Sequence, residues 1–320
     1  MVKGACLVAI ILALASGSLS AAPADPESAI QAPLASRSLL LDVAVAGDRL
    51  VAVGERGHIL VSTDGGGAWR QVEVPTRSML TAVHFHDGKL GWAVGHDALI
   101  LRSDDGGESW KQVHHDPEDN SPLFDVFFLD GSHGFAIGAY GLFLESRDGG
   151  QSWDERPIGE GDAHLHHMAR SESGKLYIAA ERGVILRSDD GGETWTELPS
   201  PYQGSFFGSF PLAGERVLLF GLRGHAFVSD DAGATWREVT TGVDTMLTGA
   251  CRSSDGRLVV VGLAGVVLVS ADEGRSWWLQ TQGDRLGISA VVPASGGDVV
   301  MAGEFGVRKV SLTAPAAPAR

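Results

Sequence analysis

One eight-residue pattern, Ser-x-Asp-x-Gly-x-x-Trp, occurs six times in this 320-residue chain, and successive copies begin 41 to 43 residues apart. A repeat of this length is typical of four-stranded blades around a central axis, because each blade must pack on its neighbours to bury its apolar faces. The aspartates and tryptophans of the six copies are Asp64 and Trp69, Asp105 and Trp110, Asp148 and Trp153, Asp190 and Trp195, Asp231 and Trp236, and Asp272 and Trp277.

A seventh repeat follows the sixth, although its pattern is incomplete. One more period after Ser270 leads to Ser311, where the pattern is reduced to Ser-Leu-Thr, but segments 298–302 and 307–310 before it still read as strands. The 43 glycines suit many tight turns between short strands. The sequence therefore predicts an all-β fold, a seven-bladed β-propeller of four-stranded antiparallel blades, over residues 25–312.

The repeated pattern predicts a hairpin between the third and fourth strands of each blade. Segment 80–113 shows the whole unit, with strands expected at 80–85, 91–95, 99–103 and 110–113. In the hairpin the aspartate accepts backbone hydrogen bonds from its own turn, and the tryptophan folds into the blade. Calcium binding or acid catalysis by these aspartates is the alternative, but the segments lack the alternating oxygen ligands of a calcium loop.

The seventh blade lacks residues for a fourth strand, because its first three strands run from about Ile288 to Val310 and the chain ends soon afterwards. An unpaired strand edge promotes aggregation. The remaining segment is residues 29–34, which precede the first inner strand at 40–43. We therefore expect the N-terminal strand to complete blade seven and close the ring.

Residues 1–24 have the features of a cleaved secretory signal peptide: Lys3, an apolar run at 7–15 and small residues at 20–22. The run is too short to span a bilayer, so we expect no membrane insertion after cleavage. Export would leave one cysteine, Cys251, and no internal disulfide. We expect the mature protein to be a monomer that is periplasmic, otherwise exported, or lumenal. Residues 313–320 are expected to form a flexible tail.

The net charge of the chain is −15. This balance argues against nucleic acid or anionic lipid as the main partner, because both carry dense negative charge. Acidic surfaces also promote solubility, so the charge identifies no partner.

Segment 91–95, followed by 99–101 and by Asp-Gly-Gly-Glu-Ser-Trp-Lys-Gln at 105–112, resembles the photosystem II stability/assembly factor family, which belongs to the wider group of bacterial neuraminidase repeat, or Asp-box, proteins. The resemblance covers about residues 38–312. It implies a seven-bladed, non-enzymatic protein that binds membrane-protein assembly intermediates from the lumenal or periplasmic side. Members of the wider family also look common in bacteria without photosynthesis, so the fold transfers more directly than the photosynthetic role.

The resemblance also implies a basic patch, and three arginines recur at the turn between the second and third strands: Arg56, Arg182 and Arg223. Tyr140 has the same position in another blade, and the remaining blades carry Asp97, Ala264 and Phe305 there. In a propeller this turn shares a face with the linkers between blades, so we expect the arginines near the mouth of the central channel. They could hold a carboxylate or an acidic peptide. The alternative is pairing with local glutamates such as Glu55 and Glu181.

Aromatic residues in the linkers extend the candidate surface. Tyr202 and Phe206 precede the inner strand of blade five. They suit either a protein-binding surface, where apolar groups are ringed by charge, or the first layer of the core. Phe207 and Met246 are interpreted as core residues.

Sialidases share the Asp box, so a glycosidase in the central channel is the alternative function. Glycoside hydrolysis needs two facing carboxyl groups, and sialidases need an arginine triad and a tyrosine–glutamate pair. Of the three tyrosines Tyr140, Tyr177 and Tyr202, the first alone shares the turn position of the arginines, and no motif ties it to a glutamate. We assign no catalytic residue and no cofactor.

Five histidines lie in or beside two consecutive linkers: His114, His115, His164, His166 and His167. Together with nearby carboxylates they could form a transition-metal site, although no ligand spacing recurs. Solvated linker histidines and a pH-sensitive binding surface are the alternatives. We assign no metal. The sequence thus favours an exported, non-enzymatic scaffold that binds a protein partner, an inner-membrane protein or its assembly intermediate.

Overall fold

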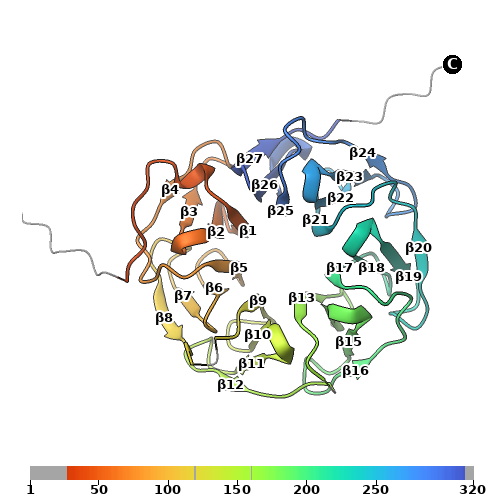
Figure 1. Ribbon diagram of the computed structural model, residues 1–320, viewed down its shortest axis with the longest axis horizontal. Coiled ribbons are helices and arrows are strands. Elements are labelled where there is room, and N and C mark those ends of the chain that lie inside the picture. The colour runs from red at the N-terminus through yellow and green to blue at the C-terminus, as the bar shows by residue number, and fades with distance from the viewer. Residues whose placement is uncertain (1–26, 119, 160, 314–320) are drawn as a thin grey trace, which may run out of the picture.

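A computed structural model describes residues 27–118, 120–159 and 161–313 as a closed ring of seven β-sheets (Figure 1). Six sheets have four strands and the seventh has three. Neighbouring strands within each sheet are antiparallel and follow one another in sequence, and all helical segments of the described residues are short 3-10 turns. None of these residues forms a helix long and apolar enough to cross a membrane. The predicted seven-bladed, all-β propeller is confirmed.

The strands of each blade are arranged from the axis outward (Figure 1). The innermost strands are β1 (Leu40–Ala46), β5 (Leu80–Phe85), β9 (Leu123–Phe128), β13 (Leu165–Arg170), β17 (Phe206–Pro211), β21 (Leu247–Arg252) and β25 (Ile288–Pro293). The second strands are β2 (Arg49–Gly54), β6 (Gly91–Gly95), β10 (Gly134–Gly138), β14 (Leu176–Ala180), β18 (Val217–Gly221), β22 (Leu258–Gly262) and β26 (Val299–Gly303).

The third and fourth strands form the outer half of each blade. The third strands are β3 (Ile59–Ser62), β7 (Ile100–Ser103), β11 (Phe143–Ser146), β15 (Ile185–Ser188), β19 (Ala226–Ser229), β23 (Val267–Ser270) and β27 (Gly306–Val310). The outer strands are β4 (Arg70–Gln71), β8 (Lys111–His114), β12 (Asp154–Glu155), β16 (Thr196–Glu197), β20 (Arg237–Val239) and β24 (Trp278–Leu279). The 3-10 turns are η1 (Ala35–Arg37), η2 (Glu55–Gly57), η3 (Ala139–Gly141), η4 (Glu181–Gly183), η5 (Leu222–Gly224), η6 (Leu263–Gly265) and η7 (Ser295–Gly297).

The core consists of seven apolar clusters, and each cluster fills the space between two adjacent blades. Alternate side chains of a strand point to opposite faces of its sheet, so the second strands, which have neighbours on both faces, are buried almost throughout. Between blades two and three, the fully buried Trp92 stacks on Phe128 with ring centroids 3.3 Å apart. Packing between sheets therefore holds the ring without a disulfide among the described residues.

The Asp boxes have the predicted structural role. In the second copy, the Asp105 carboxylate accepts hydrogen bonds from the Ser109 backbone N–H at 2.9 Å and hydroxyl at 2.6 Å, and from the Ser103 hydroxyl at 2.9 Å. The Ser103 oxygen in turn accepts the Gly107 N–H at 2.9 Å. Trp110 is 6% exposed, and its indole N–H donates to the Gly107 carbonyl at 3.0 Å. The aspartate and serine of this box thus satisfy the backbone N–H groups of their own turn, and the tryptophan anchors it in the core.

The predicted closure by an N-terminal strand is not confirmed. The sheet of blade seven has three strands, β25, β26 and β27. Residues 29–32 lie beside blade one instead, where the Ala29 N–H donates to the Val74 carbonyl at 2.9 Å and the Ala32 N–H donates to the Gln71 side chain at 2.8 Å. The Gln71 amide also donates to the Ile30 carbonyl at 3.0 Å, so one side chain of blade one both donates to and accepts from this segment.

Packing between blades one and seven closes the ring. Leu40 and Ala52 of blade one contact the same cluster as Val300 and Ala302 of blade seven, and the buried Ala35 of η1 joins it. The predicted signal peptide and residues 314–320 of the predicted tail lie outside the described residues.

Candidate functional site

The turns η2 to η6 lie on the same side of the ring as the linkers that lead into the inner strands. In every blade, the backbone N–H at the start of the turn after the second strand donates to the carbonyl of the residue that precedes the inner strand. Examples are Glu55 to Leu39 and Leu222 to Ser205, at 3.1 and 3.0 Å. We call this side, formed by these turns and linkers, the linker face. The Asp boxes occupy the opposite side, because they join the other ends of the third strands.

The middle residue of these turns has a left-handed backbone. The φ angles of Arg56, Tyr140, Arg182 and Arg223 lie between +56° and +57°. This conformation costs a non-glycine residue about 1–2 kcal/mol, and glycine would adopt it freely. All four side chains are exposed, with Tyr140 at 68%. The turn therefore presents large polar side chains to solvent at positions where the backbone favours glycine.

The three arginines differ in their partners. Arg182 binds the Asp162 carboxylate at 2.5 Å and lies 3.9 Å from that of Glu181. The hydrogen bond to Asp162 raises the pKa of Arg182, and the same contact lowers the pKa of Asp162. Arg56 and Arg223 make no hydrogen bond or ion pair with any residue that the structure describes. Local pairing thus explains Arg182 but not Arg56 or Arg223.

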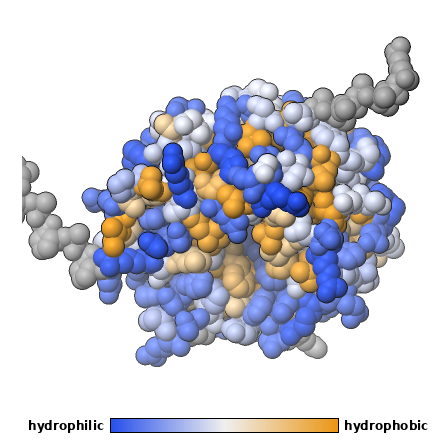
Figure 2. Space-filling model, turned by 45° about the horizontal axis from the view of Figure 1, so that its top comes forward, coloured by the Kyte–Doolittle hydropathy of each residue, from blue (hydrophilic) through white to orange (hydrophobic). Residues whose placement is uncertain are grey.

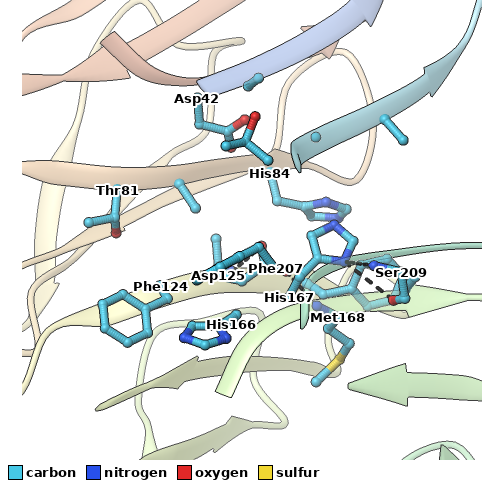
Figure 3. A pocket seen from close by; sticks show the side chains of 18 of the residues that line it. Asp42, Thr81, His84, Phe124, Asp125, His166, His167, Met168, Phe207 and Ser209 are labelled. Carbon is cyan, nitrogen blue, oxygen red and sulfur yellow. Dashed lines mark hydrogen bonds between the residues drawn. The ribbon is translucent and has the colours of Figure 1, made fainter. Parts of the chain in front are cut away.

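A row of rings connects the exposed rim to the central channel. The Tyr140 ring lies 4.9 Å from His164, and its backbone N–H donates to His164 Nδ1 at 2.9 Å. The ring centroids of His164 and Phe124 are 6.0 Å apart, and those of Phe124 and His166 are 5.8 Å apart. The His166 ring in turn lies 4.7 Å from that of Phe207, again between centroids. Phe124, His166 and Phe207 line the channel (Figure 3). An aromatic surface therefore runs from Tyr140 into the mouth of the channel.

Tyr202 and Phe206 lie beside this row but are less accessible. Phe206 has no exposed surface, so it belongs to the core and not to the binding surface for which we considered it. Tyr202 is half-buried, and its ring packs 4.4 Å from that of His225. Phe207, which we interpreted as core, is half-buried and faces the channel.

The central channel holds a cavity of about 410 Å³ lined by side chains of all seven inner strands. In the space-filling view the centre of the ring is hollowed, with apolar residues beside the hollow and hydrophilic residues farther out (Figure 2). None of Arg56, Arg182, Arg223 and Tyr140 lines this cavity. The three arginines and Tyr140 are therefore exposed on the linker face outside the lining of this cavity.

Two aspartates that were not predicted from the sequence face the channel, Asp42 and Asp125 (Figure 3). Each carboxylate accepts one N–H of its own strand and one of the next inner strand: Asp42 binds Val43 and Val83 at 2.8 Å, and Asp125 binds Met168 at 2.7 Å. Burial raises the pKa of both carboxyls to about 7. The shared pattern Leu-x-Asp-Val at 40–43 and 123–126 is the sequence signal that could have identified them.

Histidines extend this titratable side of the channel. Burial lowers the pKa of His84 and His167 to about 4, so both rings are neutral at ordinary pH. His166 Nδ1 is 2.8 Å from the Phe206 carbonyl, which requires a proton on that nitrogen. Side chains from blades six and seven, including Thr248 and Ser289, are small and uncharged. The channel therefore has a titratable side in blades one to four and a neutral side opposite.

The five linker histidines do not gather into one site. Within the described residues, no three His, Cys, Asp or Glu side chains are placed to hold a metal ion. His164 and His166 are engaged as described above, and His167 Nδ1 lies 3.4 Å from the Ser209 hydroxyl. His114 ends β8, and burial lowers its pKa. His115 follows it outside the channel lining.

Two carboxyls line the channel, those of Asp42 and Asp125. Each of them binds backbone N–H groups of two strands, and no tyrosine among the described residues lines the channel. Tyr177 is fully buried between blades. The geometry thus assigns the carboxyls to fastening adjacent inner strands.

Comparison with solved structures shows the same fold in other proteins. "YCF48 bound to D1 peptide" is 20% identical with a TM-score of 0.72, covering 90% of this chain and 97% of that one. YCF48 from Cyanidioschyzon merolae is 17% identical with a TM-score of 0.70, covering 88% and 97%. The WD40 β-propeller domain of Doa1 is 15% identical with a TM-score of 0.68, covering 85% and 92%. No curated protein sequence matches this chain.

At these identities the structural likeness shows the fold alone. The sequence itself carries the relationship further, because the family described as "Photosynthesis system II assembly factor YCF48" matches residues 24–119 and 118–287, which is most of the chain. The chain therefore belongs to the photosynthesis system II assembly factor YCF48 family.

Proposed function

We propose that this protein is a non-enzymatic scaffold that binds a protein partner on its linker face. Membership in an assembly-factor family supports this function. Support also comes from a solved structure of similar fold, "YCF48 bound to D1 peptide", in which this other protein binds a peptide. The partner of the present chain is a membrane protein or its assembly intermediate.

One observation on the molecule carries the proposal. Arg56 and Arg223 occupy left-handed turn positions, are exposed, and have no partner among the described residues. An ion pair within the protein would explain an exposed arginine at such a turn position. Arg56 and Arg223 form no such pair with any described residue. Carboxylates of a partner can bind an arginine through two parallel hydrogen bonds. The Tyr140 row on the same face adds aromatic surface, which protein interfaces favour.

The location of the protein belongs to the same proposal. An exported chain would meet the periplasmic or lumenal segments of membrane proteins, and the signal-like features of residues 1–24 support this location. Proteolytic mapping of the mature N-terminus tests it. A mature chain that begins near residue 25 is expected, and a retained Met1 would contradict it.

Affinity capture with matched variants tests the binding face. The double variant Arg56→Ala, Arg223→Ala should recover about tenfold less of the partner than the unchanged protein does. A tenfold loss corresponds to about 1.4 kcal/mol of binding free energy. Arg237→Ala on the outer strand β20 is the control, because this arginine is also exposed but lies away from the linker face. Equal recovery by all three proteins would overturn the assignment of the face.

A further inference from the structure

Blade seven ends in a strand with an open edge. β27 pairs with β26 on one side, whereas the third strand of every other blade also pairs with an outer strand. Gly303 and Gly306 close a two-residue turn as a hydrogen-bonded pair, so by the alternation of an antiparallel ladder the backbone groups of Val307 and Lys309 point away from β26. No described residue hydrogen-bonds to these outward groups.

Neither described end of the chain occupies this edge. At one end of β27, η1 lies so close that a Cβ on Gly306 would be 1.9 Å from the Ser36 carbonyl oxygen. After Val310 the chain turns away to blade six, where the Leu312 carbonyl accepts from Arg257 at 3.2 Å and the Thr313 carbonyl accepts from Trp278 at 3.1 Å. The position of a fourth strand therefore lies open between the two ends.

A groove of about 890 Å³ runs beside the edge. Its lining includes the apolar Trp69, Phe305 and Val307 and the cationic Arg37, Arg308 and Lys309. The two carboxylates of the groove are already engaged: Asp284 binds Arg308 at 2.7 Å, and Glu304 accepts the Gly287 N–H at 2.7 Å. Arg37 has no carboxylate partner among the described residues. Lys309 is paired with Asp298 outside the groove lining, at 3.7 Å. The groove thus combines free backbone groups, apolar surface and one cation, Arg37, that has no carboxylate partner among the described residues.

We propose that this edge binds an extended, acidic segment of a partner protein, which adds to β27 as the fourth strand of blade seven. Strand addition satisfies the outward backbone groups of Val307 and Lys309, and alternate side chains of the segment reach the groove. Acidic residues of the segment complement Arg37, and they add to the Asp298 carboxylate that lies 3.7 Å from Lys309. The groove shares turn and linker residues of blade seven with the linker face, but strand addition at β27 does not depend on Arg56 or Arg223.

The charge of β27 argues against a second copy of the chain as the occupant. Antiparallel self-pairing would bring Arg308 and Lys309 against the same residues of the other copy, and like charges across a sheet are unfavourable. The tail at 314–320 suits the edge poorly as well, because it contains Pro315 and Pro318, which lack a backbone N–H, and no acidic residue.

Peptide binding to the whole mature protein tests the proposal. The probes are a fluorescein-labelled octapeptide of alternating valine and glutamate and the same peptide with alternate backbone amides methylated. We expect fluorescence anisotropy to show binding of the first peptide and none of the second. Arg37→Glu should weaken binding about tenfold, whereas Lys111→Glu, on the outer strand of the complete blade two, should leave it unchanged.

A proline variant tests the backbone pairing from the side of the protein. Val307→Pro removes one outward N–H but no ladder bond, and proline is tolerated on edge strands, so we expect a folded protein with about tenfold weaker binding. Should this variant fail to fold, the methylated peptide answers the same question with the unchanged protein. Equal binding of both peptides, or no binding of either, would overturn the proposal.

Two further results would identify a different occupant. Stronger binding after removal of residues 314–320 would mean that the tail competes for the edge. A dimer in sedimentation that Val307→Pro converts to a monomer would mean that a second copy takes the place. Either result would overturn the assignment to a partner protein.

Discussion

At the scale of single residues, two kinds of side chain set the properties of the axis and the rim. Asp42 and Asp125 fasten inner strands to one another through backbone N–H groups. Arg56 and Arg223 accept a strained backbone and have no partner of their own among the described residues. The first pair therefore acts on stability, and the second pair is available for binding.

The channel carboxyls make stability depend on pH. The pKa of Asp125 is about 7 in the fold and about 3.9 in an unfolded chain. The fold thus favours the protonated carboxyl, and this contribution is complete below about pH 4 and lost as the pH rises to about 7. Between about pH 5 and pH 8, the free energy of unfolding of the unchanged protein should fall by about 1–2 kcal/mol relative to that of Asp125→Asn, and its Tm should fall with it. This value is smaller than the full pKa difference implies, because the side chain borders the channel.

Thermal melts of the two proteins across this pH range check the expectation. The asparagine loses one acceptor for a backbone N–H, which lowers stability equally at every pH, so the slope is the informative quantity. His84 and His167 affect both proteins alike and cancel in the difference. Parallel curves would show that Asp125 keeps an ordinary pKa in the fold.

At the scale of elements, one irregular blade determines how the ring closes. Blade seven keeps three strands, and the N-terminal segment that could have completed it binds blade one through Gln71. The short turn η1 then fills the junction, because Ala35 is 3% exposed and packs with Leu40 and Val300. The ring is closed by packing, and an edge remains open.

Deletion of residues 25–36 should lower stability although the segment adds no strand. The deletion removes the buried Ala29 and Ala35 and several hydrogen bonds to blade one. With net contributions of about 0.5–1.5 kcal/mol per hydrogen bond, we expect a loss of about 2–4 kcal/mol in urea unfolding. Removal of residues 314–320 is the control. An unchanged unfolding midpoint after the first deletion would mean that η1 does not seal the junction.

At the scale of the whole molecule, the sequence predicted the ring well because its signals are local and repeated. Each Asp box specifies its own turn, and the tryptophan spacing fixes the number of complete blades. Closure was predicted less well, since the choice of residues 29–32 between two blade edges depends on the side chain of Gln71, 39 residues away from Ala32.

The candidate site was predicted in part for the same reason. The turn position of Arg56, Tyr140, Arg182 and Arg223 follows from the repeat and is observed on one face. The pairing of Arg182 with Asp162, and the separation of the arginines from the channel lining, depend on distances between blades that no local pattern records. Phe206 was misjudged because the first residue of an inner strand is buried in every blade.

Hydrogen exchange of the purified complex with its captured partner tests the central claim most directly. If the linker face binds the partner, backbone amides of η2, η5 and the linkers beside them should exchange more slowly in the complex, and amides of the Asp boxes should not change. Slower exchange at the Asp boxes, with η2 and η5 unaffected, would place the partner on the opposite face and contradict the account.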